Sequence, residues 1–327
     1  MNAPNNRFNP AQTLIFVALS VIFAISSQAM PLFGLVAPLP SAMAALSLSL
    51  GNAVAVGVIT AILEAIAYTP LAGVQYFCQF ALVGIVVGWM VTQHKRYGQI
   101  FGGAMLAQIG GMVVNMASQL AFSGFNVAAF LATYTNLENT LMDNAKEMNV
   151  FTAMATQGIS ASEAEASFRQ TLHTFIQVIP AVYFVLFGIM AGILIFLVRW
   201  VCRSTRKPYV VPSPSWESII VPVWVIVPFI LAWVLILANR FINNEVLWIC
   251  ALNVMVIGAA CMAVDGFSYI IARLKLRQRS QIWQLAFLLL AFLMSWYLII
   301  FFALVGIFDA IVDYRHLRHQ EKETDIK

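Results

Sequence analysis

The stretch VGVITAILEAIAYTP, residues 56–70, is apolar apart from one carboxylate, Glu64, and a few hydroxyl groups. It lies in a 327-residue chain that is 61% hydrophobic and only 10% charged, whereas a soluble domain carries about 25% charged residues. A helix needs roughly 20 apolar residues to cross the bilayer core. The sequence therefore predicts an all-α fold, a polytopic bundle of membrane helices.

Similar apolar runs, bounded by charge, proline or glycine, follow one another along the chain. Each run is close to the length that crosses a bilayer, so we expect about nine transmembrane helices. The second and third runs are short and are also compatible with one broken hairpin. The runs are residues 12–30, 34–50, 52–69, 72–92, 99–122, 172–200, 218–239, 246–271 and 281–308.

Basic residues set the expected orientation, because cytoplasmic loops of membrane proteins carry an excess of Lys and Arg. With a cytoplasmic N-terminus, only Lys146, Arg169 and Arg240 fall outside among the first eight helices. A ninth crossing would place the basic residues of the tail outside too, so the tail could instead lie at the interface. The residues expected inside are Arg7, Lys95, Arg96, Arg199, Arg203, Arg206, Lys207, Arg273, Lys275, Arg277 and Arg279.

This orientation predicts how the chain is divided. Within the outer segment, Ser160 and Glu163 have the spacing of a capping box, so a helix should begin near Ser160. Ser27-Gln28-Ala29 resembles a signal-peptidase site, but membrane segments follow directly, which favours an uncleaved first helix. The predicted parts are a cytoplasmic N-terminus (1–11), a six-helix bundle (12–200) with an outer helical segment (123–171), a cytoplasmic loop (201–217), three additional transmembrane helices (218–309) and a polar tail (310–327).

Motifs for catalysis are missing from the sequence. There is no G-x-x-x-x-G-K-[ST] phosphate loop, no H-E-x-x-H zinc motif and no G-x-S-x-G serine elbow. The four cysteines lack metal-ligand spacing. Asp265 and Asp309 are a conceivable intramembrane aspartate pair, but such residues more often lie in water or pair with Arg. We expect no enzyme activity, no metal, no cofactor and no nucleic-acid partner.

Glu64 needs a polar partner or a cavity, because a charge at the bilayer centre costs about 2.5–3.5 kcal/mol on insertion scales. On a helix it shares one face with Gly57, Thr60 and Tyr68. In the expected orientation, other polar side chains lie at a similar outer depth. They are Gln75, Gln79, Asn115, Gln119, His173 and Gln177.

This shared depth has two interpretations. A pocket that binds a solute from outside would need polar side chains at the outer ends of several helices. Alternatively, the Gln and Asn side chains are interhelical hydrogen-bonding groups worth about 0.6 kcal/mol each, and Glu64 lies near the interface. His173, next to the outer segment, fits a solvated residue better than a ligand.

Small residues indicate where helices pack. Gly84 and Gly88 form a G-x-x-x-G pair, and Gly103, Ala107 and Gly111 make a second ridge of small side chains. In membranes such residues let helix backbones approach closely. We predict that the four glycines are helix-packing positions.

Several stretches together resemble the YybS-like (DUF2232) bacterial membrane protein family. They are APLPSAMAAL after the first helix, QGISASEAEASFRQTLHTFIQVIPAVYF before the sixth, VVPSPSW before the seventh, and the closing GIFDAIVDYRHLR. The first six helices are also similar to the S components of energy-coupling-factor transporters. That resemblance implies a six-helix bundle with an outward pocket and separate energising subunits.

These expectations give a functional hypothesis. The chain is predicted to be a transport-type protein of the bacterial cytoplasmic (inner) membrane, binding a small solute between helices one to six. Its expected partners are the lipid bilayer, the solute and membrane proteins that energise transport. The alternative is a cell-envelope scaffold, similar to the rod-shape protein MreD, that acts through protein partners.

Overall fold

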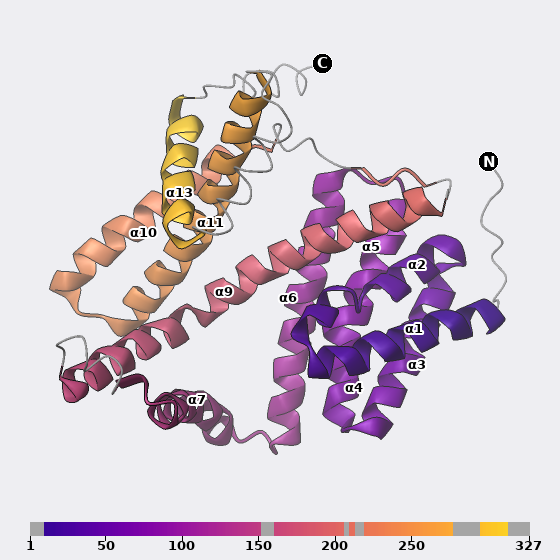
Figure 1. Cartoon of the computed structure of the whole chain (residues 1–327), viewed down its shortest axis with the longest axis horizontal. Helices are drawn as coiled ribbons and strands as arrows, with labels where there is room; N and C mark the ends of the chain where they lie inside the picture. The colour runs from indigo at the N-terminus through magenta and orange to yellow at the C-terminus, as the bar shows by residue number, and fades with distance from the viewer. Residues whose placement is uncertain (1–9, 152–159, 206–208, 213–218, 277–294, 313–327) are drawn as a thin grey trace. The chain divides into compact units, whose positions relative to one another are not determined.

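The structure is a computed structural model that describes residues 10–151, 160–205, 209–212, 219–276 and 295–312. Throughout these ranges the regular structure is helical and contains no strand, as Figure 1 shows. The predicted all-α class is therefore confirmed. The chain forms two compact units, and helix α9 contributes residues to both.

Unit 1 consists of residues 1–166 and 186–213. Within it α2 packs on α5 and α3, α1 on α3, and α5 on α6. Its helices are α1 (Pro10–Ala29), η1 (Pro31–Leu35), α2 (Leu39–Ser47), α3 (Leu50–Ala67), α4 (Pro70–Tyr76), the π-helical turn η2 (Phe77–Ala81), α5 (Leu82–Thr92), α6 (Tyr97–Phe122), α7 (Val127–Glu147) and the two ends of α9 (Ala161–Ser204).

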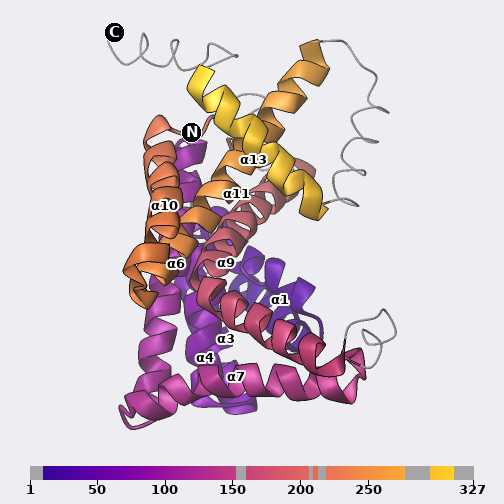
Figure 2. The same cartoon turned by 90° about the vertical axis from the view of Figure 1, so that its left-hand side faces the viewer.

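Unit 2 consists of residues 167–185 and 214–327. It combines the middle of α9 with α10 (Val223–Ile242), α11 (Glu245–Leu276) and α13 (Ser295–Val312). Helix α11 packs on both α10 and α13, and Figure 2 shows α13 lying across α11. Gly266 and Gly306 meet at this crossing, where a Cβ on Gly266 would strike Phe302 O and one on Gly306 would strike Met262 O. The two backbones are therefore in direct contact.

Seven helices in the described part of the chain are long and apolar enough to cross a membrane. Two shorter apolar helices, Leu32–Ser47 and Ile300–Val312, match the second and ninth predicted segments in part. The first half of the ninth, residues 281–294, lies outside the described residues, so the count of nine stays a prediction. The seven are Pro10–Ala29, Leu50–Ala67, Pro70–Thr92, Tyr97–Phe122, Ser162–Ser204, Trp224–Ile242 and Glu245–Arg273.

Helix α9 begins where the capping box predicted. Ser160 is its N-cap, with Ser160 Oγ accepting from Glu163 N and Glu163 Oε2 accepting from Ser160 N. The helix then runs unbroken for 44 residues, which at 1.5 Å per residue is about 66 Å. Since the bilayer core is about 30 Å thick, part of α9 must lie outside it.

The predicted packing glycines of unit 1 lie at close helix contacts. A Cβ on Gly84 would strike Pro38 O, just before α2, and a Cβ on Gly88 would lie 2.7 Å from Ala45 Cβ of α2. The second ridge contacts the α4–α5 segment instead. There Gly103 faces Met90 Sδ, and Gly111 faces Cys78 O.

Candidate functional site

Four helices of unit 1 bury hydroxyl groups that gather in one place. Ser20 comes from α1, Ser41 from α2, Thr60 from α3 and Tyr76 from the end of α4. Ser20, Ser41 and Thr60 are fully buried, and Tyr76 is 4% exposed. We call these four residues the hydroxyl cluster.

Tyr76 Oη is the common neighbour of the other three hydroxyls. Ser20, Thr60 and Ser41 all lie within hydrogen-bonding range of it. Nevertheless, none of the four hydroxyl oxygens has a hydrogen-bond partner of acceptable geometry among the described residues. The three hydroxyls therefore surround Tyr76 Oη at short range but in poor hydrogen-bond geometry, because a strong hydrogen bond requires both a short distance and a favourable angle.

Glu64 borders this cluster. It follows Thr60 by one turn of α3, is only 3% exposed, and its charge acts on Tyr76. Successive residues four apart share a helix face, so Glu64 and Thr60 point to the same side of α3. The arrangement offers a carboxylate acceptor beside hydroxyls that can donate or accept hydrogen bonds.

Small residues bring the helices of the cluster together. Gly57 lies one turn before Thr60, and a Cβ there would be 2.9 Å from Ala81 Cβ in η2. A Cβ on Gly73 of α4 would strike Ala61 O of α3. These close contacts hold Tyr76 against α3.

The local sequence sets where α3 and α4 begin. Ser49 Oγ accepts from Asn52 N at 3.2 Å and caps α3, and Thr69 Oγ1 accepts from Ala72 N at 3.1 Å and caps α4. Pro70 occupies the first turn of α4, where its missing N–H costs nothing. The chain therefore leaves α3 at Tyr68 and starts a new helix two residues later.

Some other buried polar residues of unit 1 have hydrogen-bond partners. Thr13 Oγ1 donates to Asn52 Oδ1 at 2.8 Å, and Asn52 Nδ2 donates to Ser49 Oγ at 2.7 Å. Gln108 Nε2 of α6 donates to Phe187 O at 3.1 Å. Asn115, on the same helix, is 6% exposed and its Oδ1 has no partner among the described residues.

The structure brings together some of the predicted site residues of unit 1. Thr60 and Glu64 lie at the hydroxyl cluster, whereas Tyr68, which caps the C-terminus of α3, and Gln75 are exposed. The polar face of α3 does not reach Tyr68 because the helix ends at Ala67. Three other predicted residues are Asn115, which is buried, and Gln79 and Gln119, which are half-buried.

The remaining predicted site residues belong to unit 2. His173 is exposed, and its Nε2 lies 3.1 Å from Gln177 Nε2. Gln177 Oε1 accepts a hydrogen bond from Trp248 Nε1 of α11 at 3.2 Å. These two side chains therefore take part in contacts within unit 2.

Three residues of the cluster escaped the sequence interpretation. Ser20 and Ser41 lie among apolar and small residues, where serine is typical of helix packing. Tyr76 stands between Gln75 and Cys78, at the start of the π-helical turn. In the sequence, Ser41 could have been noticed because it lies in the small-residue run APLPSAMAAL, shortly before the segment that carries Thr60 and Glu64.

Among the described residues no group of three or more His, Cys, Asp or Glu side chains could hold a metal ion. The chemical capacity of the cluster is hydrogen bonding and the charge of one carboxylate. These hydroxyls and the carboxylate can form hydrogen bonds with the polar groups of a ligand.

Comparison with known proteins identifies the family. The model of the family described as "Predicted membrane protein (DUF2232)" matches residues 14–310, and the chain belongs to this family. Comparisons with curated proteins and with solved structures give no match. The chain is thus a predicted membrane protein with several apolar helices.

Proposed function

We propose that this member of the family binds a small polar solute at the hydroxyl cluster, as a transport-type protein without chemistry on the solute. The observation that carries the proposal is the burial of four hydroxyls, those of Ser20, Ser41, Thr60 and Tyr76, without a well-formed hydrogen bond in the described part of the chain. Glu64 beside them adds a buried carboxylate acceptor.

The energetics support a role other than stability. A buried hydroxyl without a partner costs about 1–3 kcal/mol, and an apolar residue of similar shape would avoid that cost. Four such groups from four helices therefore weaken the bundle unless something binds to them. Ordered water can fill such a site, and a polar solute can replace the water.

Access is part of the proposal. Glu64 and all four cluster residues are at most 4% exposed, so the described state is closed around them. A solute would enter when helices of unit 1 separate, and its hydrogen bonds would favour the closed state, since a ligand shifts an equilibrium toward the state that it binds better. The sequence has no phosphate loop, so energy for release would come from partner subunits.

The proposed location is the bacterial cytoplasmic membrane, with the basic loops inside. Cysteine labelling of intact cells tests this orientation at two exposed positions. Glu163→Cys should react with a membrane-impermeant reagent, and Lys95→Cys should be protected until the cells are opened. Labelling of Lys95→Cys together with protection of Glu163→Cys would reverse the orientation.

The decisive substitution is Glu64→Gln, which keeps the shape of the side chain and removes its charge. Glu147→Gln, at the exposed end of α7, is the matched control. We expect both variants to insert and to unfold at the wild-type temperature, while only Glu64→Gln loses the small molecules that co-purify with the protein and are identified by mass spectrometry.

The same experiment separates the envelope-scaffold alternative. A scaffold that acts through protein partners would retain its co-purified proteins in Glu64→Gln and would carry no small molecule in the wild type. Equal solute content in Glu64→Gln and Glu147→Gln would overturn the role given to Glu64.

A further inference from the structure

The helices from α1 to α6 contain a single charged side chain, that of Glu64. From residue 8 to residue 94 the sequence has no Lys, no Arg and no other carboxylate, and α6 has no charged residue at all. The basic residues in between, Lys95 and Arg96, lie in the connection from α5 to α6. The charge of Glu64 is therefore set in a bundle that offers it no basic side chain of its own.

The fold also keeps Lys95 away from Glu64. Glu64 lies one turn before the end of α3, next to the start of the helical segment Pro70–Thr92. Lys95 follows the other end of that segment, which has 23 residues and is about 35 Å long in helical geometry. Over such a distance a loop lysine does not neutralise a buried carboxylate.

The Glu64 carboxylate is thus buried without a counter-charge from the helices around it. It is 3% exposed, and the ion pair that the described residues form joins Lys146 of α7 to Glu165 of α9 instead. Buried charges in proteins are normally paired, because removing an ion from water without a partner is costly. A positively charged ligand would supply the missing partner.

Aromatic rings add to the attraction for a cation. Phe77 and Phe80 pack in the same group of side chains as Tyr76, and the ring centroids of Tyr76 and Phe80 are 6.0 Å apart. A Cβ on Gly57 would lie 3.3 Å from Phe77 Cε2, and Gly57 shares its face of α3 with Glu64. Ring faces attract cations, and their carbon surface suits the hydrocarbon part of an organic ion.

We propose that the solute is a small organic cation, a protonated amine, whose ammonium group is bound by Glu64 and the hydroxyl cluster. This inference rests on the solute site proposed above and adds the charge of the solute. An ammonium group has N–H donors and no acceptor. The carboxylate of Glu64 and the hydroxyl oxygens, which make no well-formed hydrogen bonds with one another, are its acceptors. An anionic solute would be repelled by Glu64.

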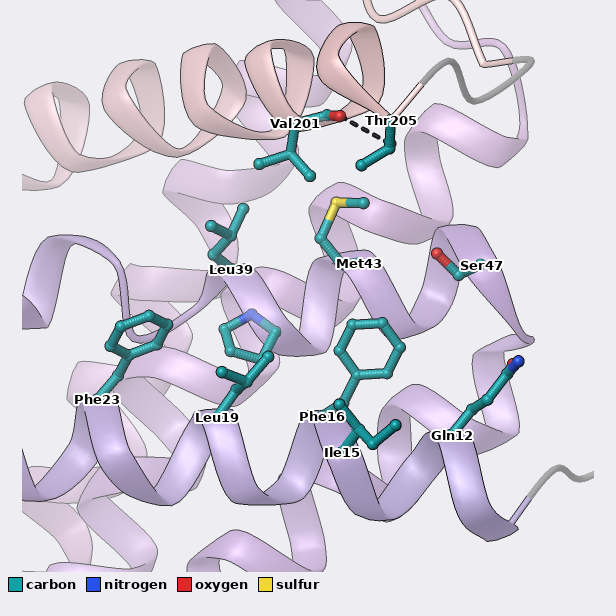
Figure 3. Close-up of a pocket in the computed structure, with 11 residues that line it drawn as sticks. Gln12, Ile15, Phe16, Leu19, Phe23, Leu39, Met43, Ser47, Val201 and Thr205 are labelled. Atoms are coloured by element: carbon teal, nitrogen blue, oxygen red, sulfur yellow. Dashed lines mark hydrogen bonds between the residues drawn. The ribbon is translucent and has the colours of Figure 1, made fainter.

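The apolar groove of unit 1 is a different surface that the test has to separate from Glu64. It has a volume of about 470 Å³ and lies between α1, α2 and the last turn of α9 (Figure 3). Its lining includes Ile15, Phe16 and Met43, and none of its lining residues in the described part of the chain is charged. A hydrocarbon chain can bind there whatever the charge of the group attached to it.

The test therefore uses probes that share one butyl chain: butylammonium, 1-butanol and butyrate, with sodium chloride as a further probe. Their binding to the full-length protein, dialysed in detergent, is measured by thermal unfolding at an ionic strength fixed with potassium chloride, since a ligand of the folded state raises the unfolding temperature. We expect butylammonium to stabilise the wild type more than any other probe. Equal stabilisation by 1-butanol, or stronger stabilisation by butyrate, would overturn the proposal.

Glu64→Gln should weaken butylammonium binding about tenfold or more, because a charged hydrogen-bond partner is lost, and should abolish the preference over 1-butanol. The controls Glu147→Gln, at the exposed end of α7, and Ile15→Trp, which places a larger side chain in the groove, should keep that preference. A preference lost in Ile15→Trp and kept in Glu64→Gln would place the cation in the groove and refute the proposal. If sodium chloride stabilises the wild type as much as butylammonium does, the amine assignment is wrong.

Thr60→Val distinguishes the charge of the solute from the existence of the site. It removes a hydroxyl and no charge, so it should weaken the binding of butylammonium and 1-butanol alike and leave their ratio unchanged. A co-purified molecule that is lost in Glu64→Gln but is neutral or anionic at neutral pH would refute the cation and leave the solute site standing. If no small molecule co-purifies with the wild type and no probe stabilises it, the solute site and the cation are both refuted.

Discussion

In unit 2 the buried side chains of Asp265 and Ser268 bond to backbone groups, whereas in unit 1 the hydroxyls of the cluster lack well-formed hydrogen bonds. In unit 2, Asp265 Oδ1 accepts from Val221 N at 3.2 Å, and Ser268 Oγ donates to Ile219 O at 2.8 Å, which tie the segment before α10 to α11. In unit 1, Ser41 and Thr60 are as deeply buried and lack such partners among the described residues.

The most specific pairing in unit 2 supports α9 where Pro180 disturbs its hydrogen bonding. Pro180 lies inside the helix, where its ring disturbs the regular hydrogen bonding. Asn253 of α11 accepts from Ala181 N at 2.9 Å and donates to Gln177 O at 2.8 Å, the two groups that α-helical geometry would join. The hydrogen bonds of Asn253 therefore stabilise α9 next to Pro180, and the hydroxyl cluster contains no bond of this kind.

The largest expected effect is common to both units, because both rely on backbone contact at glycine. Gly84→Leu and Gly88→Leu in unit 1, and Gly266→Leu in unit 2, place a side chain where a neighbouring backbone atom lies. We expect each to lower the free energy of unfolding by about 3 kcal/mol or more, measured as thermal unfolding in detergent.

Gly110→Leu and Gly192→Leu are the matched controls, since nothing lies within 4 Å of a Cβ at either position. They should unfold close to the wild-type temperature. Wild-type stability in Gly84→Leu or Gly266→Leu would mean that the helices meet along other faces.

A loss of stability of intermediate size is expected in unit 2, where a polar side chain bonds to the backbone of α9. Asn253→Leu leaves Gln177 O and Ala181 N without the side chain that binds them, and we expect a loss of about 1–3 kcal/mol. Thermal unfolding in detergent gives the value, with Asn139→Leu on the exposed surface of α7 as control. If both substitutions cost the same, the bridge at Pro180 contributes little.

The smallest effect is predicted in unit 1, for Thr60→Val. The substitution keeps the shape and removes a buried hydroxyl that makes no well-formed hydrogen bond, so stability should change by less than about 1 kcal/mol and should rise if it changes. Solute content, measured by mass spectrometry, should nevertheless fall. A stability loss as large as that of Asn253→Leu would show that Thr60 is paired like the polar groups of unit 2.

The fold class could be predicted because it depends on the hydrophobicity and the length of whole segments. The predicted run 52–69 and helix α3 (Leu50–Ala67) differ by two residues at each end, because apolar length is fixed by the bilayer and the ends by local caps. The capping box at Ser160 was also visible in the sequence. The sequence did not show that the helix beginning there continues through the run 172–200, since the proline at 180 favours a break.

The site was only partly predictable. Glu64 and Thr60 stood out as polar groups in an apolar run, but the partners of a buried cluster depend on tertiary packing. Gln75 and Gln79, four apart, would share one face of an α-helix. The π-helical turn η2 alters that spacing, and Tyr76 is buried instead.

The π-helical turn η2 (Phe77–Ala81) leads to an expectation about the length of this segment in relatives of the chain. A π-helical turn holds one residue more than an α-helical turn, and one residue corresponds to about 100° of rotation around a helix. Consider a relative with one residue fewer in this segment, whose equivalent of Tyr76 stays in the cluster. The rest of the helix would be rotated, and the equivalents of Gly84 and Gly88 would no longer face α2. The length of this segment should therefore persist in relatives that keep both features, even where its composition drifts, and a single-residue gap in an alignment would mark a branch with a rebuilt bundle.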